Sequence, residues 1–330
     1  MAEQQTILVV GEIQDGKLSA TTAELLAAGC GLAQQAETDL AVTLWGSALG
    51  DTPQQAIQAG ADRVYTVADG LLGTPQIDLV LAAMTAVCQT VSPDIVLLGR
   101  TDLGRELAPR LACRLGVSLM QDCMQVELDT DSGRLTATRP VYGGSVLARV
   151  RCTGTPQVAA IRPKAYEALE PNAARQGEVT SVAVSLDASM AKVTILRQER
   201  DESSGVKLED ANIVIAGGRG LGGPEPFAEL EELAGMLGAG IGASRAAVDA
   251  GWVPPTWQIG LTGRTITPDL YITVGISGAS QHMAGCSNAK VIVAINKDTE
   301  ANIFREARYG VAGDWTAVLP AFMQAIREMQ

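Results

Sequence analysis

Aromatic side chains, histidine and basic residues are scarce in this sequence of 330 residues. Phe, Trp and Tyr make up 4% of the chain, and His282 is the single histidine. A Ser-His-Asp triad or a histidine-rich metal site would therefore depend on that one imidazole. Lys and Arg number 25 against 37 Asp and Glu, and the net charge of −12 repels nucleic-acid phosphates and anionic lipid. We expect no nucleic-acid ligand and no metal site.

Long apolar runs and paired cysteines are also missing. No apolar run approaches the roughly 18 residues that a membrane-spanning helix needs, and the first residues, MAEQQTILVV, lack the basic region of a signal peptide. The six cysteines include no CxxC pair, which disfavours a zinc site. We therefore expect buried, reduced thiols, no membrane insertion, and a cytoplasmic protein or a mature organelle-matrix form.

Short apolar runs alternate with amphipathic stretches from residue 6 to about residue 116. The runs TILVVGE, DLAVTLW, RVYTV and DIVLLG are separated by helical patterns at 19–37, 52–60 and 76–91. Runs rich in Val, Ile and Leu between helices are typical of parallel strands that are covered on both faces. This half of the chain is therefore predicted to be α/β, with a parallel sheet.

The next segments complete the first domain and start a second one. A helix is predicted at 103–115, and strand patterns follow from 120 to 162 around the turn-like 131–133 and 143–144. We expect some antiparallel strands there to close the first domain. From residue 211, ANIVIAGG begins a second α/β unit, with predicted helices at 226–237 and 315–329 and predicted strands at 269–275 and 290–296.

A charged segment separates the two halves. Residues 197–210, RQERDESSGVKLED, hold eight charged residues out of fourteen and almost no apolar anchor. This composition predicts a linker or hinge. The domains are accordingly predicted at 1–196 and 211–330, as two Rossmann-like parallel-sheet domains joined by that linker.

A glycine-rich turn opens the second domain. Residues 218–223, GRGLGG, follow the strand NIVIAG and satisfy GxGxxG, a pattern whose glycines let a backbone approach a pyrophosphate. A nicotinamide dinucleotide site would also need an acidic residue near position 240, where the chain has GAGIGAS. The pattern alone therefore leaves two interpretations open, a nucleotide-binding loop and a plain connection between strand and helix.

Two further polar segments follow predicted apolar runs. Ser244 and Arg245 stand at an expected helix start, where Ser244 could be a simple N-cap. The segment 275–282, GISGASQH, follows the strand DLYITVG and carries two hydroxyls, an amide and the only histidine. Open parallel sheets bind ligands at the carboxyl ends of their strands, so this segment is the strongest candidate for a binding site.

At these residues the sequence resembles the alpha subunits of electron transfer flavoproteins, which carry electrons on FAD. The resemblance rests on five segments and departs from the family pattern at Leu261, where Gln is usual, and at Ser280, where an apolar residue is usual. It covers the whole second domain and, more loosely, the first. The five segments are GGRGLGG (217–223), GASRAAVDAG (242–251), QIGLTGR (258–264), LYITVGISGASQHMAG (270–285) and VIVAINKD (291–298).

The resemblance implies that FAD is the cofactor and that the second domain binds it. Arg245 would lie against the flavin ring, His282 would bond near its O2 atom, and Thr262 would bond N5, which together favour the reduced, negatively charged flavin. Ser244, Ser277 and Gly278 would serve the pyrophosphate and ribityl region, with Arg219 beside the flavin. The implied cofactor-binding residues are Arg219, Ser244, Arg245, Ile259, Gly260, Leu261, Thr262, Ser277, Gly278, Ala279, Ser280, Gln281, His282, Asn296, Asp314 and Trp315, with Asn296 and Asp314 toward the adenosine half.

The resemblance also implies partners. A beta subunit would pair with the first domain to give a heterodimer, an acyl-CoA or other flavin dehydrogenase would deliver electrons, and a quinone- or ferredoxin-linked acceptor would take them. The linker would let the FAD domain swing between these partners. Both a simple carrier, with AMP in the beta subunit, and a bifurcating one, with a second FAD there, stay open.

Two other functions fit parts of the sequence. One is a flavin- or nicotinamide-dependent oxidoreductase with its own small substrate, which the formal GxGxxG pattern supports. The other is a nucleotide-sensing or assembly module without redox function. In the carrier interpretation the chain holds no general base for a substrate carbon, because the partner dehydrogenase does that chemistry.

Overall fold

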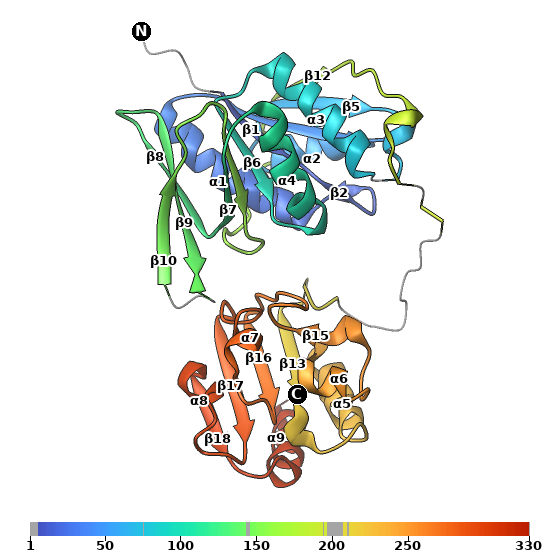
Figure 1. The fold of residues 1–330 in the computed structure, drawn as a ribbon, viewed down its shortest axis with the longest axis vertical. Helices are drawn as coiled ribbons and strands as arrows, with labels where there is room; N and C mark the ends of the chain where they lie inside the picture. Colours follow the sequence, from blue (N-terminus) through green and yellow to red (C-terminus); the bar gives the residue numbers. More distant parts are fainter. Residues whose placement is uncertain are drawn as a thin grey trace. The chain divides into compact units, whose positions relative to one another are not determined.

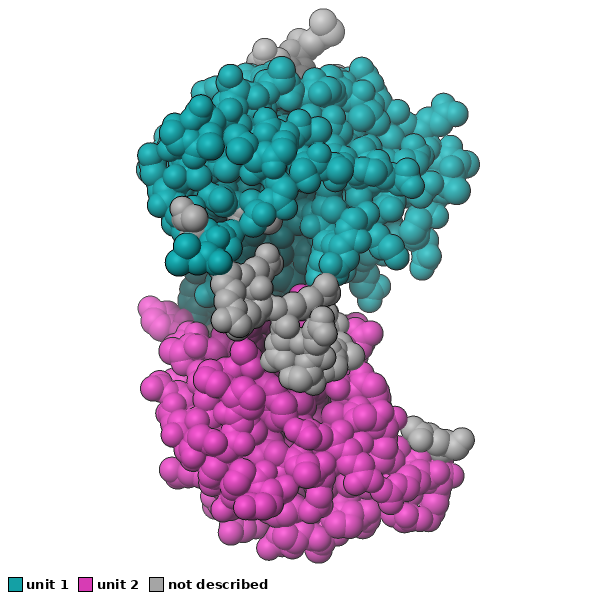
Figure 2. All heavy atoms as spheres, turned by 90° about the vertical axis from the view of Figure 1, so that its right-hand side faces the viewer, with its two compact units in different colours: residues 1–141, 145–197 teal, residues 142–144, 198–330 magenta. Residues whose placement is uncertain are grey.

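The computed structural model describes residues 6–74, 76–142, 146–193, 195–196, 207–209 and 211–329. The chain forms two compact units, one of residues 1–141 and 145–197 and the other of residues 142–144 and 198–330 (Figure 2). Both units are α/β structures built on a parallel sheet, as the sequence predicts. In the described ranges no helix combines the length and the apolar character that crossing a membrane requires.

The first unit is built on a seven-stranded sheet in which every neighbouring pair is parallel (Figure 1). The strand order is β12-β5-β4-β1-β6-β11-β7. The chain therefore proceeds outward from β1 to one side and then returns to continue on the other, which is the doubly wound arrangement. The strands are β1 (Ile7–Val10), β4 (Leu40–Gly46), β5 (Arg63–Ala68), β6 (Ile95–Gly99), β7 (Leu119–Cys123), β11 (Gln157–Ile161) and β12 (Glu178–Ser181).

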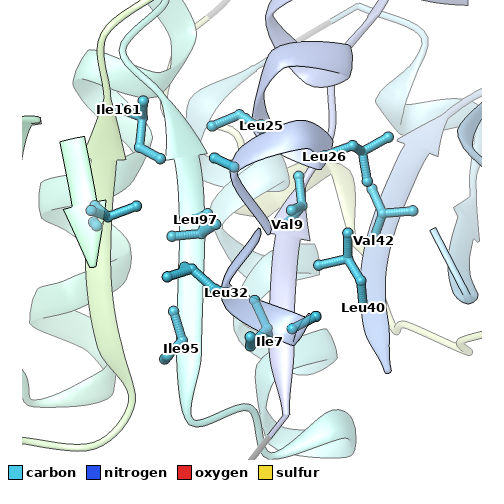
Figure 3. Close-up of a cluster of buried hydrophobic side chains, with 14 of the residues drawn as sticks. Ile7, Val9, Leu25, Leu26, Leu32, Leu40, Val42, Ile95, Leu97 and Ile161 are labelled. Atoms are coloured by element: carbon cyan, nitrogen blue, oxygen red, sulfur yellow. The ribbon is translucent and has the colours of Figure 1, made fainter. Parts of the chain in front are cut away.

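The central strands of this sheet are buried on both faces. Along β1, Ile7 and Val9 pack into the core on one face of the sheet, whereas Leu8 and Val10 pack into the core on the other. Figure 3 shows the first of these cores, with the α1 side chains lying over β1, β4 and β6. A strand with two buried faces needs an uninterrupted apolar run, which is why ILVV and IVLLG are so easily recognised in the sequence.

Helices cover both faces of the first sheet. The helix α1 (Ala20–Ala36) begins after Ser19, whose hydroxyl accepts a hydrogen bond from the Thr22 amide, and ends at Glu37 in the left-handed conformation. The helices α1 and α2 (Thr52–Gln58) pack on one face, whereas α3 (Ile77–Val91) and α4 (Asp102–Leu115) pack on the other. All four lie within a few residues of their predicted positions, and β2 (Ile13–Gln14) and β3 (Lys17–Leu18) form a small additional hairpin.

The segment 120–162 was predicted to hold some antiparallel strands, and its middle confirms this. The strands β8 (Gln125–Asp129), β9 (Arg134–Val141) and β10 (Val146–Arg151) form a separate antiparallel sheet, with the predicted turn at 131–133. In contrast, β7 and β11 at its two ends join the large parallel sheet. The all-buried sequence QVAAI of β11 is the signal for that placement. The predicted turn at 143–144 lies outside the described residues.

The six cysteines are free thiols. Cys88, Cys123, Cys152 and Cys286 are buried, as expected, and Cys30 is partly buried. The expectation was wrong for Cys113, which is exposed. Cys113 lies one position past the buried Leu111 and Ala112 of α4, where the helix turns its next side chain toward water.

The second unit is a six-stranded, all-parallel sheet with the order β15-β14-β13-β16-β17-β18 (Figure 1). One face is covered by α5 (Phe227–Leu237), α6 (Arg245–Asp249) and α9 (Trp315–Met329), and the other by loops and the short helices α7 (Ser280–Met283) and α8 (Ile303–Glu306). The strands are β13 (Ile213–Gly217), β14 (Gly240–Ser244), β15 (Gln258–Ile259), β16 (Leu270–Val274), β17 (Val291–Asn296) and β18 (Tyr309–Ala312).

The predicted linker extends too far toward the second unit. Residues 207–209 are described, and Leu208 is buried in the core of that unit together with Ala211 and Val214. Glu209 pairs with Arg264 at 2.7 Å. The prediction treated 197–210 as lacking an apolar anchor, but Leu208 is such an anchor. The rest of the predicted linker, 197–206 and 210, lies outside the described residues.

Candidate functional site

The candidate residues of the second unit lie at the carboxyl ends of its six parallel strands. Parallel strands place these ends along one edge of the sheet, which is where open α/β sheets bind ligands. The fold therefore brings to one edge residues that are nearly 100 positions apart in sequence. Arg219 follows β13; Ser244 and Arg245 end β14 and begin α6; Ile259 to Thr262 follow β15; Ser277 to His282 follow β16; Asn296 ends β17; and Asp314 and Trp315 follow β18.

This edge, the carboxyl edge, is long. Six strands at a spacing of about 4.8 Å extend across about 24 Å. Candidate groups occur after all six strands, so a ligand that uses them all must be elongated. The exposed polar groups Thr262, Ser277, Ser280 and Gln281 lie on its loops.

Ser244 has an unusual environment at the carboxyl edge. Ser244 ends the strand β14 and stands at the N-cap position of α6, at the expected helix start. The side chain nevertheless makes no capping hydrogen bond, and its buried Oγ has no partner among the described residues. The simple N-cap interpretation is therefore wrong. A buried hydroxyl without a partner costs about 1–3 kcal/mol, which a bound ligand would recover.

His282 lies in α7 with its imidazole buried. Its Nε2 is 2.7 Å from the hydroxyl of Tyr271, a fully buried residue of β16. The two rings lie nearly parallel, with a ring-centroid distance of 6.2 Å and an angle of 24°. The other nitrogen, Nδ1, is buried without a hydrogen bond of good geometry to any described residue.

Burial determines the charge of this imidazole. Removal from water lowers the pKa of His282 to about 4, and an interaction with the backbone at Ile259 offsets only part of the decrease. The ring is therefore neutral at pH 7 in the chain without ligand. A neutral imidazole carries one proton, and either nitrogen can hold it.

The two buried, unpartnered atoms share a location. Of all side-chain nitrogen and oxygen atoms that are buried without a hydrogen-bond partner, only two belong to the described part of the second unit, Ser244 Oγ and His282 Nδ1. Both belong to predicted site residues at the carboxyl edge. Buried polar groups in native proteins are nearly always hydrogen-bonded, so this pair indicates a polar ligand that supplies the missing partners.

The loop after β15 is fastened to α7. The Leu261 amide donates to the Gln281 carbonyl at 2.7 Å, and the Ile266 amide donates to the Gly285 carbonyl at 2.7 Å. Because β15 and β16 are separated by β14 and β13 in the sheet, this loop crosses the carboxyl edge to reach α7. It carries Thr262, whose hydroxyl accepts a hydrogen bond from Gln258 at 3.0 Å, and the exposed Leu261.

The glycine-rich turn after β13 packs against backbone. The Gly218 amide donates to the Val274 carbonyl at 2.8 Å and the Gly220 amide to the Gly275 carbonyl at 3.0 Å. A Cβ on Gly218 would lie only 2.2 Å from the Gly275 oxygen. These two glycines therefore allow the turns after β13 and β16 to meet at the switch point of the sheet. Of the two interpretations left open, the connection between strand and helix fits this geometry.

Further contacts shape the half of the edge near β17 and β18. Asn296 donates from Nδ2 to the Ile276 carbonyl at 2.9 Å, and Gly278 has φ +78°, with its backbone against Ile303. Asp314 accepts from the Thr316 amide and hydroxyl at 3.0 and 2.9 Å, and these bonds lower the pKa of its carboxyl. Asp314 is therefore ionised and oriented at pH 7.

Positive charge is available on the edge. Arg219 is exposed in the turn after β13, and Arg245 is exposed at the start of α6, where its Nε lies 3.1 Å from Asp249. An exposed i,i+4 pair of this kind is weak, so the guanidinium of Arg245 is free to turn toward a ligand. Together with the ionised Asp314, these groups make an edge that suits a ligand with both anionic and hydrogen-bonding parts.

Sequence reasoning missed the neighbours of His282. Tyr271 and Cys286 do not follow a strand end, and neither was singled out. The Cys286 thiol donates to the His282 carbonyl at 3.4 Å, whereas the Tyr271 hydroxyl bonds the ring. The available signal was the tyrosine in LYITV, since it is a polar-tipped aromatic residue within an apolar strand pattern of a chain poor in aromatics.

A cavity of about 500 Å³ lies elsewhere, in the first unit. It is lined by α1 residues and by residues such as Asp39 and Asp62, which precede β4 and β5. It therefore opens at the amino ends of the strands, opposite to the edge where doubly wound sheets bind ligands. Arg175, which lines it, is bonded to Asp62 at 2.8 Å and to the Gly60 carbonyl at 2.8 Å.

Comparison with known proteins gives the same family over both units. Residues 7–187 match the family model of the electron transfer flavoprotein domain, and residues 207–287 match that of the electron transfer flavoprotein FAD-binding domain. The second match starts next to Leu208, the residue that anchors the second unit.

Similar curated proteins cover the chain from end to end. An electron transfer flavoprotein subunit alpha of Thermoanaerobacterium thermosaccharolyticum is 37% identical and covers 100% of both chains. One of Bacillus subtilis is 41% identical, with 98% of each chain covered. A protein named FixB from Azorhizobium caulinodans is 39% identical over 96% of this chain and 87% of its own.

Proposed function

This chain belongs to the family of electron transfer flavoprotein alpha subunits, and from that premise we propose that its second unit carries FAD along the carboxyl edge described above. FAD is the cofactor of the family, and the FAD-binding domain is the part of the family that matches from residue 207. The protein would serve as an electron carrier, without chemistry on a substrate of its own.

The observation that carries this proposal is the pair of buried atoms at the carboxyl edge. Ser244 Oγ has no hydrogen-bond partner in the described part of the chain and His282 Nδ1 has none of good geometry, and a hydrogen-bonding ligand would complete both. FAD suits this long edge because FAD is itself an elongated molecule with a polar ring edge, a polyol and a pyrophosphate. The sixteen residues proposed to bind it end or follow the six strands that make up the edge.

Bound FAD supplies the electron chemistry, since its ring system accepts and releases one or two electrons. The protein's part is to bind that ring and to hold fixed dipoles and charges toward it. We propose that His282 presents a ring N–H to the flavin edge that becomes negative on reduction, and that Arg245 adds a positive charge. Thr262, whose hydroxyl is already oriented by Gln258, would offer a hydroxyl contact to the ring.

The remaining residues would hold the rest of FAD. The exposed hydroxyls of Ser277 and Ser280 and the backbone of Gly278 fit the pyrophosphate and ribityl region, with Arg219 as a nearby positive charge. Asn296 and Asp314 would reach the adenosine half, beside Trp315. Asn296 donates from Nδ2 to the Ile276 carbonyl and accepts at Oδ1 from the Asp298 amide at 3.0 Å, so its side chain is held in place at the edge.

The proposed partner is a beta subunit. The similar curated proteins are named subunit alpha, and we infer a heterodimer from this. The first unit also exposes apolar side chains, among them Val146 and Leu147 on the edge strand β10 and Val179 on β12. Exposed apolar residues on sheet edges are typical of surfaces that pair with another chain. A flavin dehydrogenase and a quinone- or ferredoxin-linked acceptor would then exchange electrons with the heterodimer.

The direct test is flavin content after expression with a beta subunit. The purified heterodimer should be yellow and release one FAD for each copy of this chain, and Ser244→Ala with His282→Ala should release much less. A heterodimer that assembles with the wild-type chain but carries no flavin bound to it would contradict the proposal. The total flavin count has a second use, because one FAD per heterodimer indicates a simple carrier and two indicate a bifurcating one.

A further inference from the structure

Tyr271 occupies a position that the proposed function does not assign. It is the second residue of β16, is completely buried, and lies in the core that also contains Met283 and Cys286. A buried tyrosine hydroxyl needs a hydrogen-bond partner, and this one finds the ring of His282 at 2.7 Å. The bond joins a rigid central strand to the short helix α7.

The proton of the Tyr271 hydroxyl has two possible acceptors nearby. One is His282 Nε2, and the other is the sulfur of Cys286, which also interacts with the hydroxyl. Burial raises the pKa of the Tyr271 phenol well above its ordinary value, so the hydroxyl keeps its proton. An imidazole nitrogen is a far stronger acceptor than sulfur, so the proton is donated to Nε2.

Cys286 does not compete for the imidazole. Its thiol donates to the His282 carbonyl at 3.4 Å, and burial raises the pKa of the thiol to about 12. The thiol is therefore protonated and directed at the backbone. This leaves Tyr271 as the side chain that bonds the ring, with the backbone at Ile259 as the other polar group beside it.

The hydrogen bond that Nε2 accepts determines whether the other ring nitrogen, Nδ1, carries a proton. If Nε2 accepts a hydrogen bond, the single proton of the neutral imidazole is on Nδ1. Nδ1 is the atom without a well-formed bond, and its N–H would then be available at the carboxyl edge. The backbone at Ile259 also favours a protonated ring, as an acceptor near an N–H does.

We propose that Tyr271 is a positioning residue that holds the proton of His282 on Nδ1, so that the chain presents a preformed N–H donor to the flavin edge that becomes negative on reduction. This inference rests on the proposed function for its last step, the contact with flavin. The state of the ring does not depend on flavin. A donor that is fixed before reduction stabilises the added charge without reorganisation.

The test is nitrogen NMR of the full chain labelled with ¹⁵N-histidine. Because His282 is the only histidine, every ring signal belongs to it. In the wild-type chain at pH 7 we expect Nδ1 to show the shift of a protonated nitrogen and Nε2 that of an unprotonated one. The opposite assignment would overturn the proposal without any variant, because Nε2 would then be the donor and Nδ1 would have no proton to offer.

Tyr271→Phe removes the hydroxyl and keeps the ring that packs in the core. We expect the ratio of the two tautomers to move toward protonated Nε2 by roughly five- to tenfold, the equivalent of one hydrogen bond. Cys286→Ala and Tyr309→Phe are the controls, since the first removes the other possible acceptor of the Tyr271 proton and the second an exposed hydroxyl of the same unit. Both should leave the tautomer ratio as it is in the wild type. An unchanged ratio in Tyr271→Phe, or an equal change in Cys286→Ala, would overturn the assignment.

The same samples separate this inference from the proposed function. With FAD bound, Tyr271→Phe should make the flavin harder to reduce, with a lower midpoint potential than in Tyr309→Phe. If the wild-type chain and its beta subunit bind no FAD, the proposed function fails, whereas the nitrogen spectra still decide the role of Tyr271. If FAD binds and the tautomer moves but the potential is unaltered, the ring is positioned by Tyr271 for another purpose, and the proposal is overturned at its last step.

Discussion

His282 is the only imidazole in the chain, so its titration can be followed without interference. Its pKa is about 4 in the folded chain and about 6.5 when unfolded. Between these values the unfolded state binds the proton and the folded state does not, so acidification favours unfolding. Stability of the FAD-free chain should fall as pH decreases from about 6.5 to about 4, by up to about 3 kcal/mol.

Denaturant unfolding at several pH values measures that slope. The matched variant is His282→Gln, which has no titrating ring and should lose this part of the pH dependence. Acidic groups add their own dependence, and the difference between the two chains removes it. A difference that is flat from pH 7 to pH 4, or a ring signal that titrates near 6.5, would show that the imidazole is hydrated and not buried.

Replacing Ser244 should have opposite effects on the stability of the FAD-free chain and on its affinity for FAD. Its buried hydroxyl lacks a partner in the described structure, so Ser244→Ala removes a destabilising group and should leave Tm unchanged or higher in the FAD-free chain. The same change should weaken FAD binding by about tenfold, because one hydrogen bond to the ligand is lost. Thermal unfolding and fluorescence titration with FAD measure the two effects.

The control for this prediction is Ser287→Ala. Ser287 is exposed in the same unit and was not proposed to bind FAD, so neither Tm nor affinity should change. A lower Tm in FAD-free Ser244→Ala would indicate that the hydroxyl does have a structural partner, contrary to the description above.

Among the elements of the second unit, the turn after β13 should tolerate added volume poorly. A Cβ on Gly218 would lie 2.2 Å from the Gly275 oxygen, and backbone on both sides has no room to move away. Gly218→Ala should therefore lower the free energy of unfolding by at least about 2 kcal/mol. Gly235→Ala is the matched substitution in α5, where a Cβ meets nothing within 4 Å, and it should stabilise the helix by up to about 1 kcal/mol. Equal effects at both positions would contradict the close packing of the two turns.

How far an element could be predicted depended on whether local sequence determines it. The helices α1 and α9 were predicted almost to the residue, because caps and polar boundaries define their ends. The strand β14 was missed because GIGAS is rich in glycine, and β18 because its residues are exposed at the sheet edge. The parallel pairing of β7 with β11 joins segments almost 40 residues apart, which no local pattern reveals.

Some features of the candidate site could likewise be predicted from local sequence, whereas others depend on tertiary contacts. The segments after β14, β15 and β16 could be identified because polar and small residues directly follow apolar runs. The contact between Tyr271 and His282 could not, because it depends on how α7 folds back over β16. The burial of Leu208 could not be predicted, because a single apolar residue among charged ones gives no repeating hydrophobic pattern.

At the scale of the whole molecule, Leu208 anchors the end of the charged segment in the second unit. Its side chain is buried in that unit's core, so Leu208→Ala should lower the free energy of unfolding of the unit by about 2–4 kcal/mol. Leu196 is 93% exposed, and Leu196→Ala, on the other side of the charged segment, should change it by less than about 0.5 kcal/mol. Denaturant unfolding followed by tryptophan fluorescence measures both. If both substitutions change the free energy of unfolding only slightly, residue 208 belongs to the linker, as the sequence predicted for residues up to 210.

The antiparallel sheet of the first unit is the surface on which we expect the beta subunit to dock. Its edge strand β10 exposes Val146 and Leu147, and an apolar edge strand is a template for pairing. Hydrogen exchange of β10 amides should slow on assembly with the beta subunit, whereas amides of the buried β1 should not change. If protection appears only on other elements and β10 exchanges as before, the docking surface lies elsewhere.

The meeting of Gly218 and Gly220 with Gly275 limits what a protein engineer could make of this unit. In a dinucleotide-binding turn the helix starts directly after the first strand and faces the pyrophosphate, whereas here the turn after β13 continues into a short 3-10 turn at Arg219–Leu221 before α5 begins. Grafting an acidic residue near position 240 would therefore not convert the unit to a nicotinamide dehydrogenase, because backbone contacts hold this turn in a different shape. A change of cofactor would first require moving one of the two turns. Losing the contact between the turns should lower the stability of the sheet before any change in cofactor specificity is seen.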